Sequence, residues 1–200
     1  MDDGRTIGDS LAGIDAEAWR LLEQGAADPQ SGFHYVTLAT VSRTGVAQAR
    51  TVVLRAAAVA ERMLEIHTDV RSPKWAELAE QPDATVLGFC NTTRVQLRLQ
   101  GSAVLFSPES DVSRKAWQGL SPTTRSTYQG GPPGDDLVFT PAAQAAAADA
   151  PDGAGQANFG VVRFRVSMLD WFRLQRSDNR RALFAYGAGG KIVTQLWVNP

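Results

Sequence analysis

The feature that most constrains the fold of this chain is a series of short runs rich in Val, Leu, Ile and Thr. Three of them follow one another at 35–41, 47–57 and 63–67, separated by polar breaks at 42–45 and 61–62. Short apolar runs joined by short polar turns are typical of neighbouring antiparallel strands. The pattern therefore predicts a hairpin followed by a third strand.

Further runs of the same kind continue toward the carboxyl end. Predicted strands at 84–91 and 94–106 come next, and the second is long enough to need a bend or bulge, for which Gly101 is available. Four more runs complete the set, at 159–167, 169–174, 183–186 and 192–198. Because seven or eight strands with few helices can remove their free edges by closing on themselves, we expect a mainly β barrel with peripheral helices.

Three segments favour helices around this barrel. Residues 15–26 carry apolar side chains at mostly helical spacing, with Asp15 as the predicted N-cap. Ser72 and Pro73 open a second helix, since serine is a good N-cap and proline is tolerated at the first helical position. A third helix is predicted within 108–120.

Composition limits the classes of protein that the chain can belong to. Its 200 residues suit one domain spanning 1–200, and the 44% hydrophobic content is enough for a substantial core. Residues 129–158 are rich in Gly, Pro, Ala and Asp and are predicted to form a flexible loop. A net charge of −1 gives no general attraction to nucleic acid, and no run approaches the roughly 20 apolar residues that span a bilayer. With Cys90 as the only cysteine, we expect a cytoplasmic protein without nucleic-acid or membrane partners.

The familiar catalytic and metal-binding motifs are missing from the sequence. His34 and His67 are the only histidines, and neither belongs to an HExxH motif or stands near a CxxC pair. The sequence also lacks GxSxG, the P-loop pattern and a GxGxxG after a strand. We expect no metal site, and if the protein is an enzyme, its chemistry belongs to a bound cofactor.

Three polar segments point to an anion site instead. Residues 50–55 form a predicted strand with arginine at both ends, His67 and Thr68 end the next strand, and 72–74 open the helix after it. The N-terminus of a helix, with its free N–H groups, favours phosphate, and Arg50 could add a bidentate fork. Each segment alone also fits an exposed strand-end charge or an ordinary helix start.

In this order and spacing, the segments resemble the pyridoxamine 5′-phosphate oxidase superfamily, the FMN-binding split β-barrels. That family has an Arg-x-Val-x-Leu-Lys strand, a Tyr-Thr strand end, a Ser-Arg-Lys helix start and a strand with Gln before Gly, here Gln96 before Gly101. The resemblance implies FMN in a homodimer, with its phosphate on Arg50, Thr68, Ser72 and Lys74. The cofactor-binding residues that it implies are Arg50, Thr51, Val52, Val53, Leu54, Arg55, His67, Thr68, Ser72, Lys74, Gln96, Trp171 and Arg181.

The carboxyl-terminal third extends the resemblance with one ambiguity. In the family, a tryptophan and an arginine ten residues later come from the partner subunit and close over the flavin. Trp171 and Arg181 have that spacing, but aligning the preceding strand puts Phe172 in the tryptophan position. Neighbouring residues on a strand point to opposite faces, so only one of the two aromatic rings can face the flavin. We assign Trp171 to this role.

The departures from the family pattern concern the substrate more than the cofactor. His67 replaces the tyrosine, Pro73 replaces an arginine, and the family's substrate-binding Arg-x-His pair falls on Ser177 and Asn179. The resemblance thus implies an FMN-dependent oxidoreductase in which flavin N5 accepts a hydride from a small substrate. Two alternatives are a flavin-binding module without turnover and a reductase of flavin or deazaflavin with the same fold.

Overall fold

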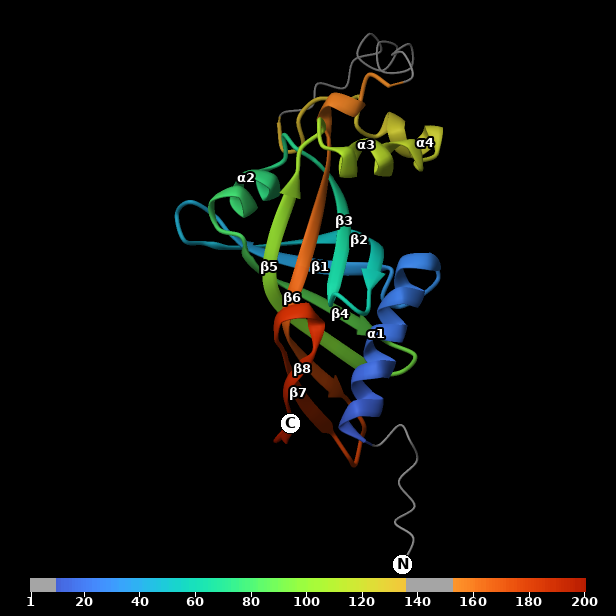
Figure 1. The fold of residues 1–200 in the computed structure, drawn as a ribbon, viewed down its shortest axis with the longest axis vertical. Helices are drawn as coiled ribbons and strands as arrows, with labels where there is room; N and C mark the ends of the chain where they lie inside the picture. Colours follow the sequence, from blue (N-terminus) through green and yellow to red (C-terminus); the bar gives the residue numbers. More distant parts are fainter. Residues whose placement is uncertain (1–9, 136–152) are drawn as a thin grey trace, which may run out of the picture.

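The computed structural model describes residues 10–135 and 153–200, which contain eight β-strands in one antiparallel sheet (Figure 1). The strand order is β3-β2-β1-β4-β5-β6-β7-β8, and β3 also pairs with β6. This extra pairing closes six strands into a barrel, and β7 and β8 extend the sheet beyond it. The strands are β1 (Tyr35–Val41), β2 (Ala47–Ala58), β3 (Met63–Asp69), β4 (Asp83–Cys90), β5 (Val95–Phe106), β6 (Phe159–Arg173), β7 (Arg180–Tyr186) and β8 (Ile192–Val198). The predicted mainly β split barrel is confirmed.

The core is built from α1 and from one face of each strand, and the contribution of the strands follows from the alternation of side chains along them. On β3, for example, Leu64, Ile66 and Thr68 are buried, whereas Met63 and Glu65 on the other face are partly exposed. Alternate residues of a strand point to opposite faces of the sheet, so one face of each strand supplies the core. The largest fully buried side chains include Trp19, Phe33, Phe164, Phe184, Leu38, Leu54 and Leu97.

The longest strand, β6, is continuous, although the sequence indicated two shorter strands at 159–167 and 169–174. Its pairing with β5 shifts register between Gln100 and Gly101, and this irregularity bends the pair without breaking it. A Cβ atom at Gly101 would lie 2.0 Å from the carbonyl oxygen of Arg165, so only glycine allows the two backbones to approach this closely. The bulge predicted at Gly101 is confirmed.

The first helix, α1 (Leu11–Ala27), begins four residues before the predicted start. Ser10 is its N-cap and accepts a hydrogen bond from the Gly13 N–H at 3.1 Å, so the prediction of Asp15 as N-cap was wrong. Asp15 lies in the second turn, where it is 3% exposed. Its carboxylate accepts hydrogen bonds from Arg62, at 2.7 Å, and from the hydroxyl of Tyr186. The residue fastens α1 to the barrel.

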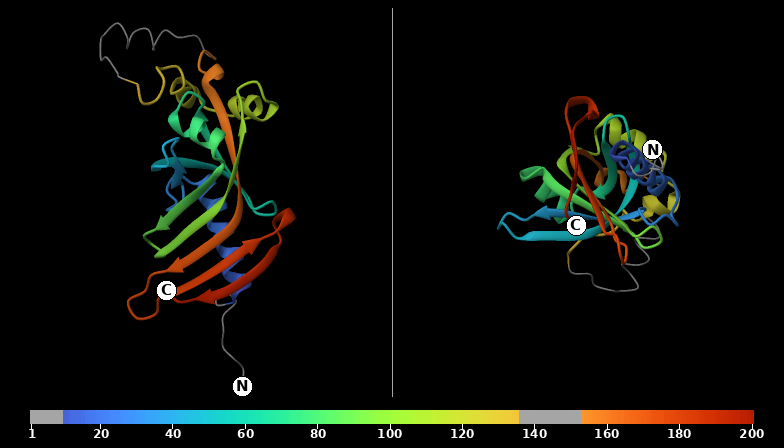
Figure 2. Two further views of the ribbon diagram at one scale, coloured as in Figure 1. Left: turned by 90° about the vertical axis from the view of Figure 1, so that its left-hand side faces the viewer. Right: turned by 90° about the horizontal axis from the view of Figure 1, so that it is seen from below.

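The remaining helices lie at the end of the barrel opposite the β7–β8 hairpin (Figures 1 and 2). They are α2 (Pro73–Glu80), α3 (Asp111–Gln118) and α4 (Pro122–Ser126), with 3-10 turns η2 (Gln156–Asn158) and η3 (Ala188–Gly190) elsewhere in the described residues. Below α3, a second apolar cluster joins Trp117, Tyr128, Phe159 and Val161. Most of the predicted flexible loop at 129–158 lies outside the described residues. None of the helices in the described parts of the chain is long and apolar enough to cross a membrane.

Candidate cofactor site

Strands β2 and β3 pair along only part of their length, which leaves an opening in the barrel wall. Their ladder in the described residues begins at Leu54 opposite Ile66 and runs from there toward the turn that joins them. The N–H of Leu54 donates to the carbonyl of His34, on the β1 side. Because backbone groups alternate in direction along a strand, those of Thr51 and Val53 point away from β1 into the opening. No residue of β2 before Leu54 has a ladder partner on β3 in the described residues, so the edge of β2 at Thr51 is not paired with β3.

Polar side chains gather beside this opening, where β3 ends and α2 begins. The chain turns through a backbone hydrogen bond from the Ser72 N–H to the carbonyl of Asp69, at 3.2 Å. The Ser72 hydroxyl donates to the same carbonyl at 2.6 Å and lies 3.4 Å from the hydroxyl of Thr68. Lys74 Nζ donates to Thr68 Oγ1 at 3.0 Å. The tight turn therefore places these polar groups at the first turn of α2.

Arg50 reaches the same place from β2. Its Nη2 atom lies 2.8 Å from Glu77 Oε2 on α2, one helical turn after Lys74. Burial lowers the pKa of Lys74, and the neighbouring charge of Arg50 lowers it further. The structure thus brings together Arg50, Thr68, Ser72 and Lys74, the four residues assigned to phosphate. We call them the phosphate cluster.

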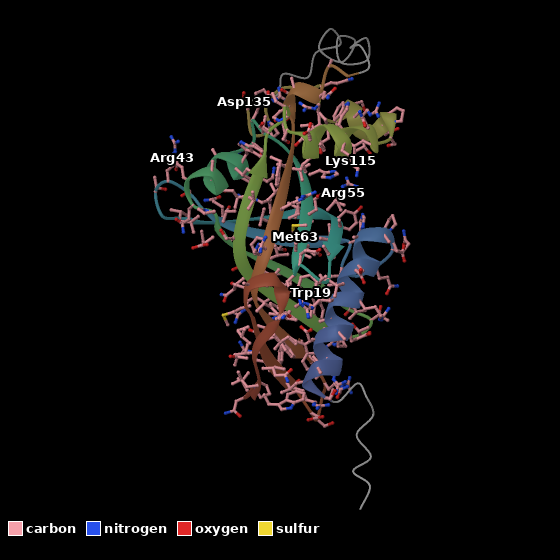
Figure 3. The ribbon with its side chains drawn as sticks, in the orientation of Figure 1. Trp19, Arg43, Arg55, Met63, Lys115 and Asp135 are labelled. Atoms are coloured by element: carbon pink, nitrogen blue, oxygen red, sulfur yellow. The ribbon has the colours of Figure 1, made fainter. Side chains whose placement is uncertain are left out.

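The other predicted residues of β2 divide between the two faces of the sheet. Val52 and Leu54 are buried in the core, so only their backbones could contribute to a site. Thr51 and Arg55 are exposed on the outer face. Arg55 lies near α3 in Figure 3, and its charge acts on the hydroxyl of Tyr128, whose pKa is nonetheless raised because burial dominates.

His67 points outward, away from the phosphate cluster. Its Nε2 lies 3.2 Å from Glu65 Oε1, and its ring packs edge-on against Phe159 with 5.0 Å between the centroids. Arg163 donates to the other oxygen of Glu65 at 3.0 Å. The hydrogen bond from His67 lowers the pKa of Glu65, with Arg163 contributing in the same direction. The Nδ1 atom of His67 is buried without a hydrogen-bond partner among the described residues.

The strand register separates Trp171 from Arg181. Trp171 lies opposite Ala182 and, at 5% exposure, belongs to the core, whereas Phe172 lies opposite both Arg181 and Gln96. Directly opposed residues share a face of the sheet, so Gln96, Phe172 and Arg181 form one row on the outer face. The geometry favours Phe172 over Trp171 as the aromatic companion of Arg181.

Arg181 is oriented by a buried carboxylate. Its Nε and Nη2 atoms donate to the two oxygens of Asp170 at 2.9 and 2.8 Å, and Arg98 Nη2 donates to the same carboxylate at 2.5 Å. Burial of Asp170 opposes its ionisation, but the hydrogen bonds and charges of the two arginines prevail and lower its pKa. The three side chains together carry one net positive charge on the outer face.

Within one chain, the outer-face row lies apart from the phosphate cluster. Strands β1 and β4 stand between β2 and β5, the strand of Gln96. On the other side of the barrel, Thr68 on β3 lies opposite Gly160 on β6, which is twelve residues before Phe172, or about 40 Å along the strand. A single chain therefore does not join Gln96 and Arg181 to the phosphate cluster.

Sequence reasoning missed three residues that the structure places beside the predicted ones. Thr40 and Glu77 hydrogen-bond to Arg50, and Asp170 binds Arg181. For Glu77, a weak signal existed in its position one turn after Lys74 on the same helix. For Thr40, the sequence held no signal, because only the strand register places it near Arg50. The described residues contain no cluster of three or more His, Cys, Asp or Glu side chains that could hold a metal ion.

Comparisons with known proteins agree with the fold. Residues 16–107 match the family model described as "Pyridoxamine 5'-phosphate oxidase, FMN-binding domain". The pyridoxine/pyridoxamine 5'-phosphate oxidase 2 of Arabidopsis thaliana is 28% identical over 200 residues, covering 94% of this chain and all of that protein. A pyridoxamine 5'-phosphate oxidase-related, FMN-binding protein of Nostoc punctiforme has a similar fold, with TM-score 0.74 and 22% identity over 98% of this chain and 100% of that one. PhzG of Burkholderia lata, solved with tetrahydrophenazine-1-carboxylic acid, is similar in fold with a TM-score of 0.75. Its sequence is 20% identical, and the match covers 99% of this chain and 98% of that one.

The fold is a split barrel, and residues 16–107 are similar to an FMN-binding domain. The chain is similar to the pyridoxamine 5′-phosphate oxidase family in sequence and in fold, which confirms the resemblance seen in the sequence. The predicted cofactor, FMN, is confirmed as well, because the matched segment is an FMN-binding domain.

Proposed function

We propose that the protein is an FMN-dependent oxidoreductase that holds the cofactor in the opening between β2 and β3. One observation carries the proposal: the edge of β2 before Leu54, which has no ladder partner on β3 in the described residues, lies next to a cluster that contains Arg50 and Lys74. A flat ring with donors and acceptors along its rim suits such an edge, and a terminal phosphate suits the two cations. Bound FMN would supply hydride transfer at flavin N5.

The residues of this chain have separable tasks in the proposed site. Arg50 and Lys74 neutralise the phosphate, and the Thr68 hydroxyl donates a hydrogen bond to one of its oxygens. The Ser72 hydroxyl, which donates to the Asp69 carbonyl, would rotate to donate to the phosphate instead. The backbone of residues 51–54 hydrogen-bonds the rim of the ring and fixes its orientation. His67 and Arg55, on the outer face of the same strands, border the space available to a substrate.

A second copy of the chain completes the site in this proposal. The outer-face row of Gln96, Phe172 and Arg181 cannot reach the phosphate cluster of its own chain, but the same row of a partner could. The outer face also exposes large apolar side chains, with Tyr35 59% and Phe89 43% exposed. Exposed apolar area of this kind is typical of an interface, and a two-fold dimer is the commonest assembly. Light scattering should report a dimer; a monomer holding one FMN per chain would contradict this part of the proposal.

The substrate is proposed to be a small molecule other than pyridoxamine phosphate. By the resemblance in the sequence, the family's substrate-binding arginine and histidine correspond to Ser177 and Asn179, so a bound phosphate would lack two cations. The Arabidopsis relative is a pyridoxine/pyridoxamine 5'-phosphate oxidase, whereas PhzG binds a phenazine carboxylic acid, so these relatives include more than one kind of ligand. Oxygen consumption by FMN-loaded protein tests this: turnover of pyridoxamine or pyridoxine phosphate at about 1 per second or faster would contradict it.

The proposal as a whole is tested by adding FMN to the purified protein. We expect a bound flavin spectrum with one FMN per chain, and no saturable binding of FMN would overturn the proposed site. If FMN binds but no hydride donor reduces it under anaerobic conditions, the non-catalytic module is the better reading. Rapid reduction by NADH or NADPH followed by release of reduced flavin would instead favour a flavin reductase.

We place the protein in the cytoplasm, with Cys90 reduced, which cell fractionation and thiol labelling can test.

A further inference from the structure

Arg50 is held along one edge of its guanidinium group by a closed triangle of hydrogen bonds. Its Nη2 donates to Glu77 Oε2 over 2.8 Å, and its Nη1 donates to the hydroxyl of Thr40. The Thr40 hydroxyl in turn donates to the same oxygen of Glu77 over 2.5 Å. Three elements, β1, β2 and α2, therefore meet through these three side chains.

The triangle is largely shielded from water. Thr40 is 2% exposed, and the side chains of Glu77 and Arg50 are 11% and 22% exposed. Removing one member of a buried ion pair leaves the other without compensation, so the two charges hold each other in place. Arg50 is thus fixed more firmly than an arginine on the open surface.

The triangle uses the edge of the guanidinium group formed by Nη1 and Nη2 and leaves the edge formed by Nε and Nη2 available for a ligand. Both terminal nitrogens face Thr40 and Glu77, and Nη1 also lies 3.4 Å from the carbonyl oxygen of Leu38. Among residues 10–135 and 153–200, no hydrogen bond uses the Nε atom of Arg50. The Nε–H and the second N–H of Nη2 therefore form a fork that matches two oxygens of one phosphate group.

We propose that Glu77 and Thr40 are positioning residues of the phosphate cluster, which hold Arg50 so that its Nε edge is presented to the phosphate of FMN. This inference rests on the proposed function and adds two residues that do not touch the cofactor. It also assigns a charge balance: Glu77 offsets one of the two cations, Arg50 and Lys74, so the empty cluster carries one net positive charge. Without Glu77, the two cations would repel each other.

The experiment compares affinities for FMN and for riboflavin, which lacks the phosphate, in variants of the full-length chain. Glu77→Ala removes the carboxylate, and Thr40→Val removes only the hydroxyl at nearly constant shape. Glu77→Gln keeps an acceptor of the same length. The matched control is Glu80→Ala, on the same helix, whose partner Arg43 is 77% exposed and lies at the tip of the β1–β2 hairpin (Figure 3).

The expected result is a loss that depends on the phosphate. Glu77→Ala and Thr40→Val should each weaken FMN binding by about tenfold, the size of one charge-assisted hydrogen bond, and leave the affinity for riboflavin unchanged. Glu77→Gln should recover most of that loss, and Glu80→Ala should bind both flavins like the wild type. In an Arg50→Ala background, Glu77→Ala should cause no further loss, because the residue acts through Arg50.

Several outcomes would overturn the inference. If Glu77→Ala binds FMN as tightly as the wild type, or more tightly, Glu77 does not position Arg50. An equal loss for FMN and riboflavin would mean that Glu77 and Thr40 only support the fold. A wild-type protein that fails to distinguish FMN from riboflavin would overturn the proposed phosphate site itself, and this inference with it. The wild-type measurement therefore separates the two failures.

Discussion

Replacing Arg50 with alanine is the substitution whose effect on cofactor binding follows most directly from the structure. Arg50 offers the fork formed by Nε and Nη2 to the phosphate, and losing one charge-assisted contact of this kind costs about 1.5–3 kcal/mol. Its removal also leaves the carboxylate of Glu77, 11% exposed, without its cation beside the phosphate. We therefore expect FMN affinity to fall by about 1.5–3 kcal/mol, or roughly 10- to 150-fold.

Titration of the apoprotein with FMN, followed by quenching of flavin fluorescence, measures this loss. Arg50→Lys should recover only part of it, because a point charge does not replace the planar fork. Arg43→Ala is the control, since Arg43 lies at the tip of the same β1–β2 hairpin and is 77% exposed. Circular dichroism should show that all three variants remain folded. An Arg50→Ala protein with unchanged affinity, or an equal loss in Arg43→Ala, would refute the assignment of Arg50 to the phosphate.

Three further predictions concern charged and buried groups. Burial and the charge of Arg50 lower the pKa of Lys74, so FMN affinity should begin to fall at a lower pH than the ordinary pKa of lysine would give. In Lys74→Arg, this alkaline decline should vanish. Asp170→Asn should lower the free energy of unfolding by about 1–2 kcal/mol at pH 7, after allowance for screening at the exposed arginines. The pKa of Asp170 in the folded protein lies below its ordinary 3.8, so the stability difference between wild type and Asp170→Asn should persist down to about pH 4 and disappear as the pH falls through the folded pKa. Urea denaturation measures this difference, and a difference that does not change with pH would contradict the prediction. Tyr186→Phe should cost about 2–4 kcal/mol in the same assay, because Asp15 and Trp19 each lose a buried hydrogen bond to its hydroxyl, and a cost below 1 kcal/mol would show that water replaces it.

Local sequence patterns were sufficient for most of the strands and for the proximity of Thr68, Ser72 and Lys74. The first strand was predicted as 35–41, the observed bounds of β1, because its apolar run ends at polar turn residues on both sides. The phosphate cluster could be predicted because Thr68, Ser72 and Lys74 are separated by one turn of chain. Only Arg50 required a contact between distant segments, and that contact came from the resemblance to a known family.

Features that depend on strand register could not be predicted from the sequence. Spacing alone favoured Trp171, but the pairing of β6 with β7 places Phe172 opposite Arg181 and turns Trp171 into the core. A shift of one residue in register exchanges the two faces of a strand, and no local pattern fixes that shift. The role of Asp15 was missed for a similar reason, because its partners Arg62 and Tyr186 belong to distant strands or turns.

The affinity ratio between FMN and riboflavin in the wild-type protein tests the central claim most directly. The two ligands share the ring that would bind along β2 and differ only in the phosphate, so their ratio isolates the contribution of Arg50, Thr68, Ser72 and Lys74. With two cations and two hydroxyls at the site, we expect FMN to bind at least about 100-fold more tightly, equivalent to about 2.7 kcal/mol. The advantage should shrink in Arg50→Ala and Lys74→Ala. Equal affinity for the two flavins would contradict the account.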